Sequence, residues 1–360
     1  MFENYQAALA LVVVGAPECL DLSLDAEELF ALLQDTGGRD RLTALIGKRV
    51  GPVDWRAFDA QRDAVARTGT RCLCPRDPEY PEALREVAQP PALLFCKGDV
   101  ERLRVRGVAV VGTRKPSPGG VAFAKRLARD LSAAGVTVVS GLARGIDTAA
   151  HSGALGLPGT TVAVIGTGLD VPYPAENAAL MMEIAAEGCV VSEQLMGMHA
   201  AAHVFPRRNR MISALAHAVV VVEGGLRSGA LITARWALEQ GRDVGAVPGF
   251  PGDFRAQGPN HLIRQGGFLV EGAGDVFDAV PLLRPEPVAG GEERASEDDD
   301  APPGAQAVLA ALSRSGAPVD EIAAHTGLAV ADVQRHLLEL ELAGLAESDA
   351  AGRYARPQGA

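Results

Sequence analysis

The chain has 360 residues, of which 48% are hydrophobic and only 4% aromatic, and it carries a formal net charge of −11. This length predicts two or three domains whose cores are filled mainly by Ala, Val and Leu. No run of 18 or more apolar residues occurs and no signal peptide is recognisable, so we expect no membrane span and a cytoplasmic location. The five cysteines are scattered and odd in number, and we expect all of them to be reduced and structural.

The charge is distributed unevenly along the chain. Residues 1–106 contain 14 basic and 17 acidic side chains, residues 107–265 contain 14 and 11, and residues 266–360 contain 6 and 17. The net charges are therefore −3, +3 and −11. The middle segment is cationic relative to both flanks, which is a clue to the partners it binds.

Residues 1–68 predict a small helical domain. The segments 25–34 and 55–69 have helical spacing of their apolar residues, and glycines interrupt the chain between them. Nothing in this part has the appearance of a catalytic site.

Residues 69–284 predict a doubly wound, Rossmann-like domain. Short apolar runs at 70–75 and 91–98 are bounded by Pro and Gly, as strands often are. From residue 107 onward, continuous apolar strands alternate with amphipathic helices, of which the fifth, 228–241, has Ser228 as its expected N-cap. Strands of this kind between helices indicate a parallel sheet that is covered on both faces.

Residues 285–303 predict an acidic, disordered linker rich in Pro and Gly. Residues 304–360 then predict three helices followed by a hairpin, which is the pattern of a winged helix-turn-helix domain.

Six loops follow the predicted strands of the Rossmann-like domain, at the sheet edge where such folds bind ligands. The loops are rich in glycine, which exposes backbone N–H groups, and they carry arginines that we expect to converge on one rim. These are Arg114, Arg144, Arg207, Arg208, Arg210 and Arg227. The pattern predicts a site for an anion, and phosphate is the natural ligand. Each arginine taken alone has a structural alternative, in which it caps a carbonyl or pairs with Asp147, Asp170 or Glu193.

Other candidate side chains are less specific. Phe205 fits a core position or a platform on which a base stacks. His151 is expected to be a satisfied core histidine, and Asp147, Asp170 and Glu193 are candidate bases by location alone. The spacings predict no metal site and no cofactor.

Several segments together resemble the DprA family of bacterial DNA-processing proteins. They are VAVVGTRKPSPGG, SGLARGIDTAAHSGAL, TVAVIGTGLDVPYPAEN, FPRRNRMISALA and VVVVEGGLRSGALITARWALEQGRDV, in this order, with DPEYPEALREVAQPPALLFCKGD upstream. The resemblance covers the whole Rossmann-like domain, and the two flanking domains fit the family's layout, in which the N-terminal domain is SAM-like.

The resemblance implies a non-catalytic protein that binds and protects single-stranded DNA. It implies partners as well: the recombinase RecA, which such proteins load onto DNA in natural transformation and recombination, single-strand binding protein, and a second copy of the chain, joined through the Rossmann-like domain. The implied DNA contacts are Gly112, Thr113, Arg114, Ser140, Gly141, Arg144, Gly145, Phe205, Arg207, Asn209 and Arg210, with Arg208 added at what we take as the variable position of F-P-x-R-N-R.

Two other functions compete with this hypothesis. Related sheets occur in nucleotide phosphoribohydrolases, which carry the motif P-G-G-x-G-T-x-x-E. The segment EGGLRSGALITA of this chain resembles that motif in distorted form and lacks its final Glu. A winged-helix regulator that senses a nucleotide is the third hypothesis, but it needs a basic recognition helix.

The predicted recognition helix, within 329–344, is not basic, and it generates the first prediction. It has Arg335 and His336 against Asp332, Glu339 and Glu341. A helix that reads duplex DNA should be basic, so we expect this domain to contact protein, with RecA as the first candidate, or to be structural. Residues 304–360 alone should not bind duplex DNA at low salt in a fluorescence anisotropy titration, and tight binding would contradict this interpretation.

Overall fold

The computed structural model describes residues 32–33, 36–50, 53–285, 305–312, 316–342, 345–349 and 353–355. The chain divides into two compact units, residues 1–285 and residues 286–360. Most of the predicted helix 25–34, linker residues 286–303 and about half of the predicted N-terminal domain lie outside the described residues, and the boundary near residue 68 stays a prediction. Among the described residues, no helix is both long and apolar enough to cross a membrane.

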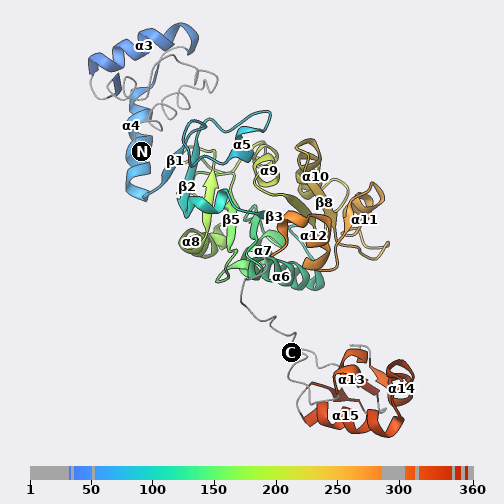
Figure 1. The fold of residues 1–360 in the computed structure, drawn as a ribbon. Helices are drawn as coiled ribbons and strands as arrows, with labels where there is room; N and C mark the ends of the chain where they lie inside the picture. Colours follow the sequence, from blue (N-terminus) through green and yellow to red (C-terminus); the bar gives the residue numbers. More distant parts are fainter. Residues whose placement is uncertain are drawn as a thin grey trace. The chain divides into compact units, whose positions relative to one another are not determined.

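The first unit is built around a nine-stranded, mostly parallel sheet (Figure 1). Its order is β1 (Arg71–Leu73), β2 (Leu94–Gly98), β6 (Cys189–Ser192), β5 (Thr161–Val164), β4 (Thr137–Ser140), β3 (Gly107–Val111), β7 (Ala218–Val221), β8 (Asp243–Ala246) and β9 (Phe268–Leu269). The strands from β6 to β9 are parallel, whereas β1 and β2 are antiparallel at one edge. The doubly wound parallel sheet is thus confirmed, and the two strands before residue 107 extend it with an antiparallel edge that the sequence analysis did not specify.

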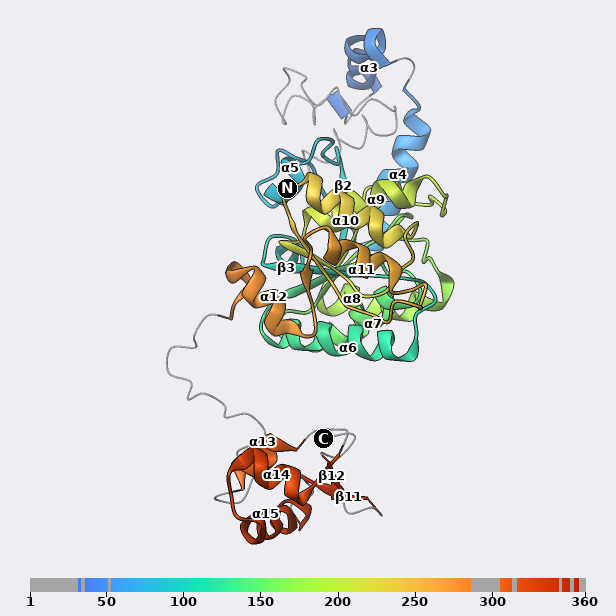
Figure 2. The same ribbon diagram turned by 90° about the vertical axis from the view of Figure 1, so that its right-hand side faces the viewer.

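Alternation along β3 explains how one apolar run serves two cores. Val108 and Val110 belong to the core under α6 (Pro118–Ala133) and α7 (Ile146–Ala154). Ala109 and Val111 belong to the core under α9 (Val204–Ala214) and α10 (Gly229–Glu239). Successive side chains of a strand point to opposite faces, so a strand covered on both faces must be apolar throughout. Figure 2 shows α9 and α10 on one side of the sheet and α6 and α7 on the other.

The remaining elements of this unit complete the two layers and its periphery. They are α3 (Thr36–Val50), α4 (Trp55–Thr68), α5 (Glu82–Arg85), η2 (Val100–Leu103), η3 (Ala175–Asn177), α8 (Ala178–Glu187), α11 (Gln257–Arg264), α12 (Ala273–Ala279) and η4 (Pro281–Leu283). The sequence analysis did not predict α11, β9 or α12.

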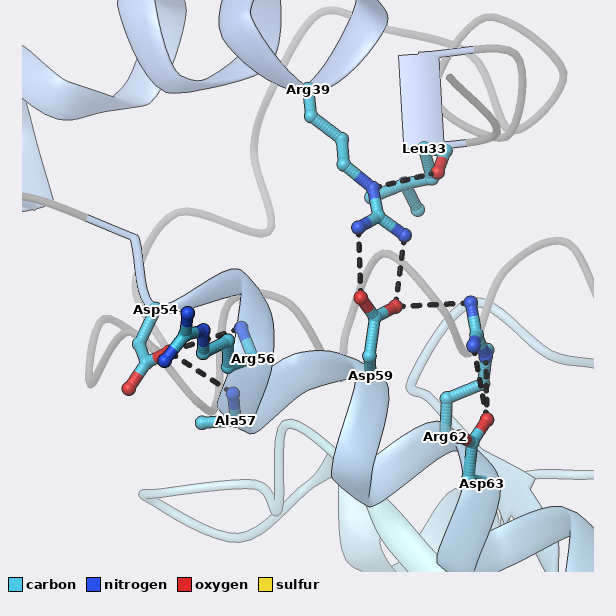
Figure 3. A network of polar contacts seen from close by, with 8 residues as sticks. All are labelled: Leu33, Arg39, Asp54, Arg56, Ala57, Asp59, Arg62 and Asp63. Carbon is cyan, nitrogen blue, oxygen red and sulfur yellow. Dashed lines mark hydrogen bonds and ion pairs between the residues drawn. The ribbon is translucent and has the colours of Figure 1, made fainter. Parts of the chain in front are cut away.

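A polar network joins α3 to α4 (Figure 3). Arg39 donates both terminal nitrogens to the Asp59 carboxylate at 2.9 Å, and its Nε donates to the carbonyl of Leu33. The Arg39 guanidinium holds the pKa of the Asp59 carboxyl below its usual value. The N-cap Asp54 accepts from two N–H groups at the start of α4, and Gly69 ends the helix in the left-handed region at φ +63°.

Helix α4 is also tied to the sheet domain. The Gln61 amide donates to the carbonyl of Met196 and accepts from its N–H, both at 2.9 Å. Met196 lies in the segment after β6, so α4 is anchored beside the carboxyl edge of the sheet.

The second unit has the winged-helix pattern. Helices α13 (Gln306–Ala311), α14 (Val319–Thr326) and α15 (Val330–Leu342) accompany a small sheet of β10 (Ala317–Pro318), β12 (Arg353–Ala355) and β11 (Glu347–Ser348). Strands β11 and β12 pair antiparallel as the predicted hairpin. Val333, Leu337 and Leu340 are buried along α15 at helical spacing and pack on Ile322 of α14.

The described cysteines are as expected. Cys72, Cys74, Cys96 and Cys189 are free and buried, and burial raises the pKa of the Cys72 thiol to about 12. A thiol this hard to ionise is a poor nucleophile and a poor metal ligand at neutral pH.

Candidate functional site

The strand order creates a crevice at the carboxyl edge of the sheet. The chain runs from β3 outward through β4, β5 and β6, and then returns to the other side of β3 at β7. The loops after β3 and β7 therefore diverge, and ligands of open α/β sheets bind at such a point. A cavity of about 430 Å³ lies here, and a smaller hollow adjoins it. Both are lined by Arg114, Ala143, Phe205 and Arg208.

A cation and two aromatic rings meet between the two hollows. The Arg114 guanidinium lies 5.3 Å from the centroid of the Phe205 ring, and the Phe205 and Tyr173 rings are 5.5 Å apart, tilted by 38°. Phe205 is half-buried, while Tyr173 is 42% exposed. The alternative in which Phe205 is simply a core residue is therefore wrong, because its ring forms a wall that a planar ligand can reach.

Arg208 lies beneath this surface and is 5% exposed. Its Nη1 donates to the carbonyl oxygens of Gly141, at 2.6 Å, and Val164. Burial lowers the pKa of Arg208 to about 10, and the nearby Asp147 carboxylate limits this decrease. The group is thus still a cation at neutral pH, and it fixes a positive charge in the floor shared by the two hollows.

Asp147 is the second residue of α7, and its side chain holds the loop after β4 in place. Its Oδ2 accepts from the N–H groups of Gly141 and Ala143, at 3.1 and 3.4 Å. Burial raises the pKa of this carboxyl, while Arg208 and the two N–H groups oppose the rise.

His151 and Asn177 fasten the same loop from behind. Leu142 adopts a left-handed conformation at φ +56°; its N–H donates to His151 Nε2, and its carbonyl accepts from the Asn177 amide at 2.9 Å. Thr161 already donates its hydroxyl to Val138, so His151 donates from Nδ1 to Thr161 Oγ1 and is neutral. Burial lowers the pKa of His151 to about 3. The expectation of a satisfied core histidine is confirmed.

Two glycines of this loop are required by close approach. A Cβ on Gly141 would lie 2.4 Å from Arg208 Nη1, so a larger residue would displace the guanidinium. Gly145 has φ +81°, and a Cβ there would lie 2.5 Å from the carbonyl of Thr113. Gly145 thus brings the loops after β3 and β4 together.

Arg144 extends from the same loop to the smaller hollow, where it is paired. Its Nε and Nη2 donate to the two oxygens of Glu176 at 2.6 and 2.8 Å, with both side chains more than half exposed. The ion pair raises the pKa of Arg144 and lowers that of Glu176.

We expected the segment FPRRNR to end a loop, with the next helix beginning at Asn209. The structure instead places the whole segment inside a helix. Helix α9 begins at Val204, with Pro206 in its first turn, where a proline is tolerated. Successive residues of a helix are turned by about 100°, so Arg208 points away from Arg207 and Arg210, which lie three residues apart on one side and both pair with Glu193. Arg207 is exposed and Arg208 lies under the hollows, whereas Arg210 is buried toward Glu193, to which its Nη2 donates. The prediction that these arginines converge on one rim was wrong.

The motif register was also misassigned. Counted along F-P-x-R-N-R, the variable position is Arg207, and Arg208 is the first motif arginine. The geometry agrees, because Arg208 lines both hollows and Arg207 lines neither.

The structure brings most of the predicted residues together, but not all of them. The larger cavity is lined by Gly112, Thr113, Arg114, Phe205, Arg208 and Asn209, and the smaller hollow adds Gly141 and Arg144. Four predicted residues line neither: Ser140, Gly145, Arg207 and Arg210. The buried Ser140 donates its hydroxyl to Val110, and Arg227 also lies outside both linings.

Several lining residues were missed by the sequence analysis. They are Lys115, Tyr173, Gly229, Thr233 and Phe254. All of them lie in or next to strand-end segments that we had quoted, so location gave a signal, but no residue type singled them out. The predicted N-cap Ser228 does head α10, yet its Oγ makes no capping bond and is buried without a hydrogen-bond partner.

Fold and site define a Rossmann-like protein that presents fixed cations and aromatic rings at the switch point of its sheet, followed by a winged helix. The model of the family described as DNA recombination-mediator protein A matches residues 71–281, and that of the DprA winged helix domain matches residues 292–352. The chain belongs to the DprA family.

Individual relatives agree with this assignment. A protein named Smf from Synechocystis is 36% identical over an alignment of 316 residues, and the match covers 79% of this chain and 79% of that protein. The crystal structure of DprA from Streptococcus pneumoniae has a TM-score of 0.60 and 34% identity, over 77% of this chain and 94% of that one. A structure from Helicobacter pylori, whose title describes a single-stranded DNA binding mode of DprA, has a TM-score of 0.55 and 28% identity, over 60% of this chain and 97% of that one.

The position of Arg210 predicts that it stabilises the fold and does not contact a ligand at the two hollows. Arg210 and Glu193 are 4% and 7% exposed. Removing one member of a buried ion pair leaves the other uncompensated, which costs about 3–5 kcal/mol. Arg210→Met should therefore lower the free energy of unfolding by about that amount in urea denaturation, and the added change Glu193→Met should recover much of it.

Arg207→Met is the matched comparison, because Arg207 pairs with the same Glu193 carboxylate at 3.4 Å but its side chain is 60% exposed. It should change stability by less than about 0.5 kcal/mol. If Arg210→Met kept its stability but lost ligand binding, the buried arginine would be a ligand contact after all.

Proposed function

We propose that this protein binds single-stranded DNA across the two hollows and acts without catalysis. The observation that carries the proposal is the group of Arg114, Phe205 and Tyr173 above the buried cation of Arg208. Unstacked bases bind to aromatic faces, and the phosphates between them bind to arginine and lysine. Arg114 and Lys115 are exposed at the cavity, where they would meet the backbone of a strand.

The geometry favours single strands over duplex. Phe205 is half-buried at the wall of a hollow, so a base must leave its stack to lie against it. Contacts of this type tolerate any base, because every base has an aromatic face. Phosphate contacts likewise give affinity without sequence readout.

The lining offers little for an enzyme. Asp147 is the single carboxylate among the described residues that line the two hollows, and its Oδ2 is already used by two N–H groups. A hydrolase needs a free base near its reacting atoms. Release of free base from AMP or CMP would nevertheless revive the phosphoribohydrolase alternative.

Loading of RecA follows as the wider role that we propose, together with binding to strands coated by single-strand binding protein and dimerisation through the Rossmann-like domain. Family membership supports these partners. Their test is RecA-dependent ATP hydrolysis on coated single strands, which the protein should accelerate and the DNA-binding variants below should not.

Removal of the Phe205 ring and removal of the Arg114 cation should have different effects on DNA affinity. Phe205→Ala should weaken binding to labelled poly-dT by about 5- to 150-fold, since one stacked base contributes about 1–3 kcal/mol. Arg114→Ala should also weaken binding and should reduce the slope of log affinity against log salt by about 0.7, the effect of one phosphate contact on a single strand. Anisotropy over a salt series measures both.

The control for this pair is Arg129→Ala. Arg129 is exposed on α6 and lines neither hollow. It should bind poly-dT as the wild type does. If folded Phe205→Ala and Arg114→Ala variants bound equally well too, the site would be elsewhere.

The pairing of Arg144 predicts a variant that binds more tightly. Glu176 accepts from Nε and Nη2 of Arg144, and a phosphate that binds to these two donors must compete with it. Glu176→Gln should raise affinity for poly-dT by about two- to fivefold at low salt, which corresponds to the small free energy of an exposed ion pair. Glu183→Gln, exposed on α8, makes the same charge change outside the lining. An equal gain in both variants would show a general charge effect and would remove Arg144 from the proposed site.

A further inference from the structure

A second large cavity lies away from the DNA site, between the segment 83–89 and the C-terminal end of α10. It has a volume of about 390 Å³. Its lining residues are Ala83, Glu86, Val87, Ala88, Gln89, Arg210, Trp236, Glu239, Gln240 and Arg242. The proposed function uses none of them.

Buried polar atoms without partners gather at this cavity. Among the described residues, nine buried side-chain nitrogen and oxygen atoms have no hydrogen-bond partner. Four of the nine belong to lining residues of this cavity: Nε and Nη1 of Arg210, Nε of Arg242 and Oε1 of Gln240. Native proteins satisfy almost all such atoms, so a cluster of exceptions needs an explanation, and a missing ligand is one.

The chemistry of these atoms defines what a ligand must supply. Arg210 is 4% exposed, and Glu193 meets only its Nη2. The donors of Arg210 and Arg242 require an anion, ideally a flat carboxylate. Gln240 Oε1 requires a donor, since its Nε2 already donates to the carbonyl of Arg210. One wall of the cavity is apolar and is formed by Ala83, Val87 and Trp236, so the ligand must also have an apolar part.

We propose that this cavity binds the C-terminal residue of a partner protein chain. That residue supplies all three requirements at once: a carboxylate for the arginines, a backbone N–H for Gln240 and an apolar side chain for Trp236. Glu86 and Glu239 are exposed at the same cavity, so they disfavour polyanions such as DNA and favour a basic residue upstream of the terminus.

The test uses the fluorescence of Trp236 in the full-length chain. The sequence has two tryptophans, so Trp55→Phe leaves Trp236 as the reporter. The probe is N-acetyl-Lys-Ala-Leu with a free carboxylate, compared with the same peptide as its C-terminal amide. We expect the acid to change the fluorescence with saturation and the amide to bind at least about tenfold more weakly, the loss typical of one charge-assisted hydrogen bond.

Two variants in that background locate the binding. Arg242→Gln removes one cation from a half-buried position and should weaken the acid by about tenfold. Ala83→Phe fills the cavity and should abolish the response, while the thermal melting midpoint reports that each variant is folded. Arg242 is only half-buried, so we expect Arg242→Gln to fold and to test binding even if Ala83→Phe prevents folding.

Four results would overturn the proposal. They are equal binding of acid and amide, no binding of either at millimolar peptide, an undiminished response in folded variants, and equal binding of N-acetyl-leucine and the tripeptide, which would indicate a small organic acid rather than a chain terminus.

Discussion

The site depends on the burial of one cation, Arg208, under the loops of the carboxyl edge. A charged group in the interior is costly unless it is compensated, and here the carbonyls of Gly141 and Val164 accept from Nη1 and the Asp147 carboxylate offsets the charge, while Nε has no hydrogen-bond partner among the described residues. This single group explains features that are otherwise unrelated. Gly141 lacks a side chain because the guanidinium occupies that space. Leu142 tolerates its left-handed backbone because Asp147, His151 and Asn177 hold the loop on both sides.

Rigidity of this floor matters for a binder that reads no sequence. Such a protein gains affinity only from contacts that every strand offers, namely phosphates and base faces. Donors that are already fixed lose little further freedom when the ligand arrives. Arg208 and its loop are thus held before any ligand arrives, whereas the side chains of Arg114 and Tyr173 are exposed and Arg144 is held only by an exposed ion pair with Glu176.

The fold was predictable from the sequence because its strands are uninterrupted apolar runs between amphipathic helices. The antiparallel edge was not, since β1 and β2 are short, mainly apolar runs as parallel strands also are, and pairing direction leaves no mark on composition. The site was predicted at the level of loops and partly at the level of residues. Sequence adjacency misled us at FPRRNR, where three neighbouring arginines suggested one cluster. One extra turn of helix separated them, because Val204 rather than Asn209 begins α9. Tyr173 and Phe254 were missed for the opposite reason: they come from loops far apart in the chain, and only the sheet brings them to the same edge.

Helix α9 shows how one segment of sequence can serve two sites. Arg208 faces the two hollows at the carboxyl edge, and Arg210, turned by about 200°, lines the second cavity and pairs with Glu193. Helix α10 also lines both cavities, with Gly229 and Thr233 near its start at the first and Trp236 and Glu239 near its end at the second. Shared helices do not by themselves make the two sites cooperative, because coupling requires an element with two arrangements that both ligands bias. The buried pair of Arg210 and Glu193 opposes any rotation of α9 that would serve as such an element. The arrangement thus favours two proposed sites that are held in fixed relation and occupied independently.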